Sequence, residues 1–453
     1  MVVRSTVAWM GDVWAVPAAV ASRENRSKMV GSSLRFIEIS AVYGLGDIIA
    51  RNNTKDTKET KMNERTKILH HGDTPEKYFG AVNPPVVHAS LFGYRTVEEF
   101  RAVNRDPFHQ PVYHREYNPT VGVLEEKIAM LEHAEAGIAF SSGMGAITAP
   151  LLALLSHGDH LLVIDSVYGP TRQFCNDTLT RMGIQVEYFS AAESANLAPR
   201  LKDNTRLIYL ESPGSLTFEI QDIEAVTRLA RARGIYTIID NSWATPLYQK
   251  PLDMGVDIVV HSGTKYIAGH SDLTLGLLAC SEALFKKIKP TAVLLGAVLS
   301  PDDAYLALRG LRTLPLRMAQ HQESALKIAR WLASRPEVRE VLHPGLPTFP
   351  GYELAKRQMT GYSSLFSFRL QPGTAEARRA FVDTLELFLI GYSWGGYESL
   401  MLPLDRAFAG EPDWRARRGL DDDLFRTSIG LEDPDDLIAD LERGLAAWRA
   451  AMD

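Results

Sequence analysis

The chain carries a lysine among hydroxyl side chains directly after an apolar run. Residues 256–260 are expected to form a strand, and Lys265 follows on a turn with Ser262 and Thr264. An amine in an apolar setting has a lowered pKa, so its neutral form can attack an aldehyde, and the two hydroxyls could bind a phosphate beside it. Taken alone, the segment also fits an ordinary surface lysine after a turn, which is the commoner case.

Two other turns after expected strands have residues suited to a flat, phosphorylated ligand. Apart from Met144, residues 141–146 are small, and Gly143 lies where a helix should begin, so backbone N–H groups and the helix dipole could hold an anion. Tyr168 follows the next strand and could lay its ring over an aromatic cofactor. A tight turn and a packing tyrosine are the simpler interpretations of each segment by itself.

An aspartate also stands at the end of an apolar strand. Asp240 follows residues 235–239, all of which are suited to a buried strand. A carboxylate in that position needs a partner, and a protonated pyridine nitrogen is one. The alternative is an N-cap of the next helix.

In combination these residues predict a site for pyridoxal phosphate. Lys265 would form the Schiff base, Asp240 would pair with the pyridine nitrogen, and the remaining turns would supply the ring stack and the phosphate cradle. An amino-acid substrate adds a carboxylate, which Arg426 could bind through two hydrogen bonds, although other arginines could do the same.

The elements that must position these residues alternate between strands and helices. Apolar strands separated by spacers of helical length predict a largely parallel sheet with helices on both faces, and ligands bind at the carboxyl ends of such strands. The predicted strands are 137–140, 160–164, 185–189, 207–210, 235–239 and 256–260. A helix is expected from Val121, and beyond about Pro315 the pattern predicts a second, smaller α/β domain.

The composition favours a soluble globular enzyme and small-molecule partners. The 453 residues include 45% hydrophobic and 23% charged residues, with a net charge of −6 and a pI near 6.1. No basic patch for nucleic acid or for a membrane surface is expected. The two cysteines, Cys175 and Cys280, favour a reduced, cytoplasmic location. The longest apolar run, 146–155, is too short to span a membrane. His157 and His160 have no third partner at metal-binding spacing, so no metal is expected.

The chain divides into four segments. Residues 1–61 end in a polar run and are expected to be disordered or not native, with Met62 as the biological start. Residues 62–118 have little periodicity and are expected to form an arm that contacts a neighbouring subunit. Residues 119–315 are expected to form the cofactor-binding domain and 316–453 the C-terminal α/β domain.

From about Met62 onward the chain resembles the Cys/Met-metabolism family of pyridoxal-phosphate enzymes, and within it most resembles the bacterial cystathionine β-lyases. The matching motifs are Y-H-R at 113–115, S-G-M at 142–144, D-S-V-Y at 165–168, E-S-P-G-S at 211–215, D-N-S-W at 240–243, T-K-Y at 264–266, G-H-S-D at 269–272, Y-S-W-G-G-Y-E-S-L at 392–400 and I-G-L-E-D at 429–433.

The resemblance implies the type I fold of pyridoxal-phosphate-dependent transferases, similar to aspartate aminotransferase, with a mainly parallel seven-stranded sheet. It implies a homo-oligomer, usually a tetramer built as a dimer of dimers with shared sites. Lys265 is implied to be the Schiff-base lysine and proton shuttle. The cofactor is implied to contact Asp240, Tyr168, Gly143, Met144, Ser262 and Thr264. From the neighbouring subunit, Tyr113 is implied to lie beside the Schiff base and Arg115 on the phosphate. The substrate carboxylate is implied to bind Arg426, Ser393 and Trp394.

The resemblance also predicts the reaction, which is β-elimination from L-cystathionine in methionine biosynthesis. Gly214 and Ser215 stand where γ-acting relatives have threonine and asparagine. Tyr392 stands where many of them have a glutamate, and Pro170 replaces the cysteine of methionine γ-lyases. Val293 departs from an active-site tyrosine of the enterobacterial β-lyases, which leaves room for other cysteine S-conjugates or for cysteine desulfhydration. A γ-synthase or γ-lyase is the first alternative, and a non-catalytic cofactor-binding homologue is the second.

Overall fold

A computed structural model describes residues 62–405 and 412–453. By its internal contacts the chain divides into two units, Met1–Met62 and Asn63–Asp453, and the description below concerns the second. The expectations for residues 1–61 lie outside the described residues. In the described part of the chain, no helix is long and apolar enough to cross a membrane.

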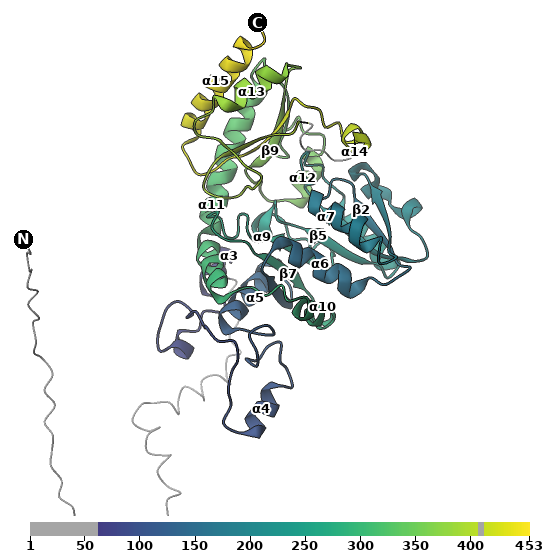
Figure 1. Ribbon diagram of the computed structural model, residues 1–453, viewed down its shortest axis with the longest axis vertical. Helices are drawn as coiled ribbons and strands as arrows, with labels where there is room; N and C mark the ends of the chain where they lie inside the picture. Colours follow the sequence, from purple (N-terminus) through teal and green to yellow (C-terminus); the bar gives the residue numbers. More distant parts are fainter. Residues whose placement is uncertain (1–61, 406–411) are drawn as a thin grey trace, which may run out of the picture. The chain divides into compact units, whose positions relative to one another are not determined.

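A seven-stranded sheet forms the centre of the larger domain (Figure 1). Its order is β1-β7-β6-β5-β4-β2-β3, in which β7 runs antiparallel to both neighbours and the strands from β6 to β3 are parallel. The strands are β1 Ala136–Phe140, β2 His160–Ile164, β3 Gln185–Phe189, β4 Thr205–Glu211, β5 Tyr236–Asp240, β6 Ile258–Ser262 and β7 Gly276–Cys280. The mainly parallel, seven-stranded sheet that the resemblance implies is confirmed. The residue pattern located six of its strands but not β7.

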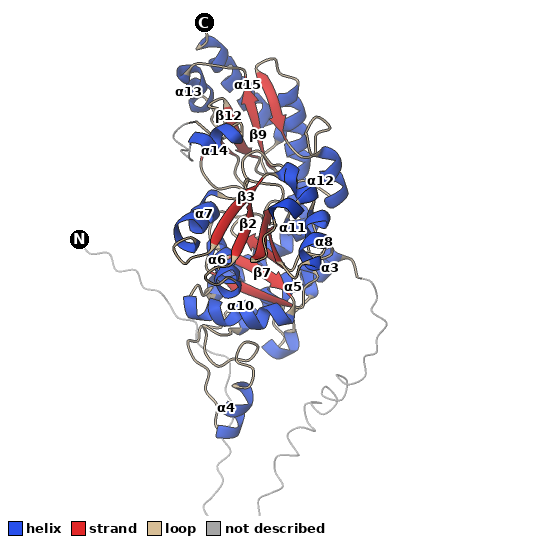
Figure 2. Cartoon of the chain, turned by 90° about the vertical axis from the view of Figure 1, so that its right-hand side faces the viewer, coloured by secondary structure: helices blue, strands red, loops and turns tan. Residues whose placement is uncertain are grey.

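Helices cover both faces of this sheet, as parallel strands require. Figure 2 shows α6 and α7 on one side of the strands and α5 and α8 on the other. The helices of this domain are α5 Pro119–Glu132, α6 Gly143–Leu154, α7 Gly169–Gln173, α8 Ile223–Ala232, α9 Thr245–Tyr248 and α10 Glu282–Leu295, with a π-helix at Phe174–Leu179 and 3₁₀ turns at Ala191–Asn196 and Ala198–Arg200. The strands pack with α6, α8 and α10 in one apolar cluster, in which Cys175 and Cys280 are buried thiols. The apolar side chains of α5 belong to a second cluster.

The segment before α5 has little regular structure. It holds α3 Glu64–His70, a 3₁₀ turn at Pro75–Tyr78 and α4 Val97–Val103, and a single bridge joins Leu91 to Tyr113. Large apolar side chains of this segment are exposed, including those of Phe79, Val82 and Val97. The contact of this arm with another subunit stays a prediction.

A second sheet forms the core of the C-terminal region, in the order β10-β11-β12-β9-β8. The strands are β8 Val338–Leu342, β9 Leu365–Leu370, β10 Leu389–Ile390, β11 Leu400–Pro403 and β12 Leu424–Ser428, and the helices are α11 Pro301–Ala333, α12 Tyr352–Gln358, α13 Ala375–Asp383, α14 Pro412–Arg417 and α15 Pro434–Ala450. Helix α11 runs unbroken through position 315, where the sequence predicts a domain boundary, so it belongs to both regions.

Candidate active site

A cavity of about 280 Å³ opens at the carboxyl ends of β4, β5 and β6, between the two sheets. Loops and strand ends from both domains line it, as expected for a ligand site in a parallel α/β sheet. The predicted site residues that line this cavity are Gly143, Met144, Tyr168, Asp240, Ser262, Thr264, Lys265, Trp394 and Arg426. Predicted site residues from six separate stretches of sequence therefore meet at one place.

Lys265 lies within this cavity on the turn after β6. Its Nζ donates a hydrogen bond to Ser393 Oγ at 2.9 Å and lies 5.3 Å from the centre of the Trp394 ring. Burial lowers the pKa of Lys265 to about 8, and the nearby Arg426 guanidinium acts in the same direction. A substantial fraction of this amine is therefore neutral near pH 8, as attack on an aldehyde requires.

Asp240 is the last residue of β5 and faces the same cavity. The backbone N–H of Ser242 donates to Asp240 Oδ1 at 2.9 Å. Burial raises the pKa of the Asp240 carboxyl, and the bonds from Ser242 oppose this shift. The adjacent Glu211 on β4 also has a raised pKa, about 8, because it is buried and faces Asp240. A cationic ring nitrogen placed here would relieve the cost of burying charge on Asp240.

The N-terminus of α6 and the end of β6 approach each other closely at the other side of the cavity. A Cβ on Gly143 would lie 2.9 Å from Cβ and Oγ of Ser262, so only glycine leaves this space open. The Ser262 N–H donates to Ser242 Oγ at 2.6 Å. The Thr264 hydroxyl accepts a hydrogen bond from Leu275 N–H at 2.9 Å and lies 3.2 Å from Leu275 O. The backbone of Leu275 therefore orients this hydroxyl. Small residues at a helix N-terminus fit a phosphate.

Tyr168 covers the cavity from the loop after β2. Its backbone N–H donates to Glu211 Oε2 at 2.8 Å, which fixes the loop to the end of β4. The side chain is 46% exposed, and burial followed by the charge of Asp240 raises the pKa of its phenol. The ring is thus a neutral aromatic surface that could cover a flat ligand.

Arg426 reaches the cavity from β12 of the second sheet. Its Nη2 donates to the carbonyl oxygen of Tyr392 and lies 3.5 Å from that of Ser393. Burial lowers the pKa of this guanidinium to about 10, so it remains a cation at neutral pH. One loop therefore orients both Arg426 and Lys265, and the fork of the guanidinium suits a carboxylate.

Three positions singled out in the sequence lie away from this cavity. Tyr113 is 42% exposed, and the Arg115 guanidinium lies 5.0 Å from the centre of its ring. Neither residue lines the cavity around Lys265 of the same chain. Val293 lies on α10 and, with Arg115, lines a separate small cavity beside β1.

Sequence reasoning gave no role to several residues that shape the site. Glu211 holds the Tyr168 loop, and Ser242 contacts both Asp240 and Ser262. Both residues belong to motifs that carry the family resemblance. Glu211 ends a strand, as Asp240 does, and this position could have indicated that it belongs to the site. That inference requires knowing that β4 and β5 are neighbours in the sheet.

Comparisons with known proteins decide the family. A model described as "Cys/Met metabolism PLP-dependent enzyme" matches residues 65–446. The chain belongs to this family. It is 44% identical, over 87% of this chain and 99% of the relative, to a Rhizobium johnstonii protein named provisionally as a cystathionine β-lyase. It is 40% identical to an L-methionine γ-lyase of Pseudomonas putida, over 84% and 97% of the two chains.

Solved structures of the family have the same fold. A cystathionine γ-synthase from Xanthomonas oryzae pv. oryzae superposes with a TM-score of 0.81 at 37% identity, covering 86% of this chain and all of that one. The predicted type I fold and the dependence on pyridoxal phosphate are therefore confirmed. The cavity fits this cofactor, since it combines a lysine of lowered pKa, a buried carboxyl and a glycine-lined helix N-terminus. Among the described residues, no cluster of three or more His, Cys, Asp or Glu side chains could hold a metal ion.

Proposed function

We propose that the protein catalyses β-elimination of L-cystathionine. With water, the reaction gives L-homocysteine, pyruvate and ammonia. The observation that carries this proposal is the placement of Lys265, whose pKa is about 8, within one cavity that Asp240 and Arg426 also line. These groups meet the three needs of the chemistry, which are an amine that can exchange a proton, an anchor for a pyridine ring and a cation for a substrate carboxylate.

Each end of the cofactor has candidate ligands in this site. Asp240 would hold the pyridine nitrogen, and Tyr168 would cover the ring. The phosphate would bind among Gly143, Met144, Ser262 and Thr264. When bound, pyridoxal phosphate supplies an electron-withdrawing ring that stabilises negative charge at the substrate α-carbon.

The residues of the chain would orient the substrate and move its protons. Arg426 would bind the substrate carboxylate, with Ser393 and Trp394 beside it. Because Arg426 and Lys265 line the same cavity, this grip would present the α-hydrogen to Nζ of Lys265, whose neutral amine would accept the proton. The Cβ–S bond would then break, and Lys265 would return the proton to the departing sulfur.

Residue types at the cavity favour β-elimination over γ-chemistry. Gly214, Ser215 and Tyr392 follow the β-lyase pattern, and Ser215 and Tyr392 both line the cavity. A relative named cystathionine β-lyase from Bacillus subtilis is 40% identical over 84% of this chain. The equal identity to the Pseudomonas putida L-methionine γ-lyase makes γ-elimination the second candidate.

The site is proposed to be completed by a neighbouring copy of the chain. Tyr113 and Arg115 are exposed or half-exposed on the arm and lie outside the cavity of their own chain. In a homo-oligomer they would reach the phosphate and Lys265 of the adjacent subunit. A tetramer built from two such dimers is the proposed assembly.

Product analysis on L-cystathionine tests the proposal. Pyruvate and homocysteine in equal amounts support β-elimination. Cysteine and 2-oxobutyrate would replace the proposal with γ-elimination. Absence of turnover by protein that has bound the cofactor would favour the non-catalytic alternative.

A further inference from the structure

Three buried polar side chains meet beneath the cavity, on the side of the strands opposite the proposed cofactor. Glu132 Oε1 lies 2.6 Å from Nε2 of His261 and accepts a hydrogen bond from Nδ2 of Asn241 at 3.0 Å. Glu132 and Asn241 are 0% exposed, and His261 is 1% exposed. Glu132 ends α5, Asn241 follows β5, and His261 lies in β6. One carboxylate oxygen therefore links a helix to two strand ends.

Each partner of Glu132 is the immediate neighbour of a proposed cofactor ligand. Asn241 follows Asp240, and His261 precedes Ser262. Successive side chains of a strand point to opposite faces. In β6 this alternation turns Ser262 into the cavity and His261 toward Glu132.

The same network reaches the end of a third strand. Asn241 Nδ2 also donates to the backbone oxygen of Gln249 at 3.1 Å, and Gln249 Nε2 donates to the backbone oxygen of Ser212 at 3.2 Å. Ser212 directly follows Glu211, which holds the Tyr168 loop. Polar contacts thus link the ends of β4, β5 and β6.

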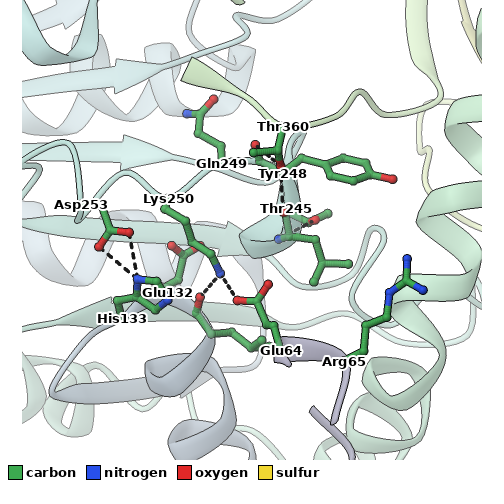
Figure 3. A network of polar contacts seen from close by, with 12 residues as sticks. Glu64, Arg65, Glu132, His133, Thr245, Tyr248, Gln249, Lys250, Asp253 and Thr360 are labelled. Carbon is green, nitrogen blue, oxygen red and sulfur yellow. Dashed lines mark hydrogen bonds and ion pairs between the residues drawn. The ribbon is translucent and has the colours of Figure 1, made fainter. Parts of the chain in front are cut away.

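The backbone around Glu132 is itself fixed on both sides, as Figure 3 shows. Lys250 Nζ donates to the backbone oxygen of Leu131 at 2.5 Å and pairs with Glu64. On the other side, His133 adopts a left-handed conformation, with φ of 59°, and its ring lies 2.9 Å from Asp253. The residues on both sides of Glu132 are therefore held by contacts to other elements, which suits a group that orients others.

Loss of the Glu132 carboxylate would leave two buried donors without their acceptor. A buried polar group that loses its partner costs about 1–3 kcal/mol, and the strand ends can recover part of this only by moving. Such a movement displaces Asp240 and Ser262, since each is one residue away. We propose that Glu132 is a positioning residue that sets the orientation of Asp240 and Ser262 toward the cofactor. The inference rests on the cofactor roles proposed above for these two residues.

The test compares Glu132→Ala with a matched variant from the same helix. Lys127 is also fully buried in α5, but its Nζ bonds Ile68 O at 3.0 Å and Asp73 at 3.3 Å, away from the strand ends. Both variants are stripped of cofactor and titrated with pyridoxal phosphate. Visible circular dichroism per bound cofactor reports the orientation of the ring, and the melting temperature reports stability.

Glu132→Ala should weaken cofactor binding by about tenfold and alter the visible circular dichroism, because two buried donors lose their acceptor. Lys127→Ala should melt earlier while leaving both cofactor readouts unchanged. Glu132→Gln should restore both readouts, since its side-chain oxygen can take the place of Oε1 and accept from both Asn241 and His261. Cofactor readouts of Glu132→Ala that equal those of the wild type, or those of Lys127→Ala, would overturn the inference.

Two further variants keep the test decisive. If Glu132→Ala does not fold, Asn241→Ala replaces it, and an unchanged circular dichroism signal for that variant overturns the inference. Asp240→Ala separates this inference from the proposed function. If Asp240→Ala leaves cofactor binding and spectrum unchanged, the proposed site roles fail. If it changes them while Glu132→Ala does not, only the positioning role of Glu132 fails.

Discussion

Lys265 Nζ donates a hydrogen bond to Ser393 Oγ at 2.9 Å, although the two residues belong to different domains. The loop that carries Ser393 also supplies the backbone oxygens that orient Arg426. The proposed base and the proposed carboxylate grip are therefore held by a single segment of the C-terminal domain. A substrate carboxylate drawn to Arg426 would meet Lys265 in a fixed relative position, which is the main requirement for efficient proton transfer.

Replacement of the lysine tests its proposed role as the base. Lys265→Ala should lower turnover of cystathionine by at least about a thousandfold, because it removes both the covalent anchor and the proton acceptor. Lys286→Ala, at an exposed ion pair on α10, should retain wild-type turnover. Pyruvate release measured in parallel for both variants checks this, and appreciable turnover by Lys265→Ala would refute the role.

The lowered pKa of Lys265 predicts how cofactor uptake depends on pH. The neutral amine attacks the aldehyde, and burial brings the pKa of this lysine from 10.5 to about 8. The rate of Schiff-base formation by cofactor-free protein should therefore rise with pH, reach half its maximum near pH 8 and level off above about pH 9. Stopped-flow absorbance between pH 6 and pH 10 measures it. A rate still rising steeply above pH 9 would contradict the lowered pKa.

The glycine at the start of α6 gives a steric prediction. Gly143→Ala would place a Cβ 2.9 Å from Ser262, which closes the proposed phosphate cradle. Cofactor affinity should fall by about tenfold or more, since both backbones must shift. Gly169→Ala provides the matched control, because a Cβ there meets no atom within 4 Å. Equal affinities of the two variants, measured by cofactor titration, would place the phosphate elsewhere.

A shared active site predicts that two inactive variants rescue each other. In a mixed dimer of Arg115→Ala and Lys265→Ala chains, one of the two sites receives intact Lys265 from one chain and intact Arg115 from the other. Co-expression should then restore up to about a quarter of wild-type activity, because half of the dimers are mixed. If both residues acted within one chain, the mixture would stay as inactive as the separate variants.

Much of this site follows from the sequence because parallel strands bring their carboxyl ends together. Asp240 and Lys265 follow successive strands, so their meeting is predictable without coordinates. The residue pattern did not locate the antiparallel strand β7, because residues 276–280 follow the lysine loop without the helical spacer that marks the other strands. The contact of Glu132 with His261 and Asn241 joins residues more than a hundred positions apart, and no local pattern indicates it. Arg115 lies outside the cavity of its own chain, and this too is decided by the packing of the chain and not by sequence spacing.

The products formed from L-cystathionine test the proposed reaction most directly. Purified protein loaded with pyridoxal phosphate is incubated with L-cystathionine. The thiol amino acid and the 2-oxo acid that form are both identified and quantified by mass spectrometry. β-elimination through Lys265 predicts homocysteine and pyruvate in a one-to-one ratio, and their loss in Lys265→Ala. Cysteine together with 2-oxobutyrate would contradict it and assign the protein to γ-elimination.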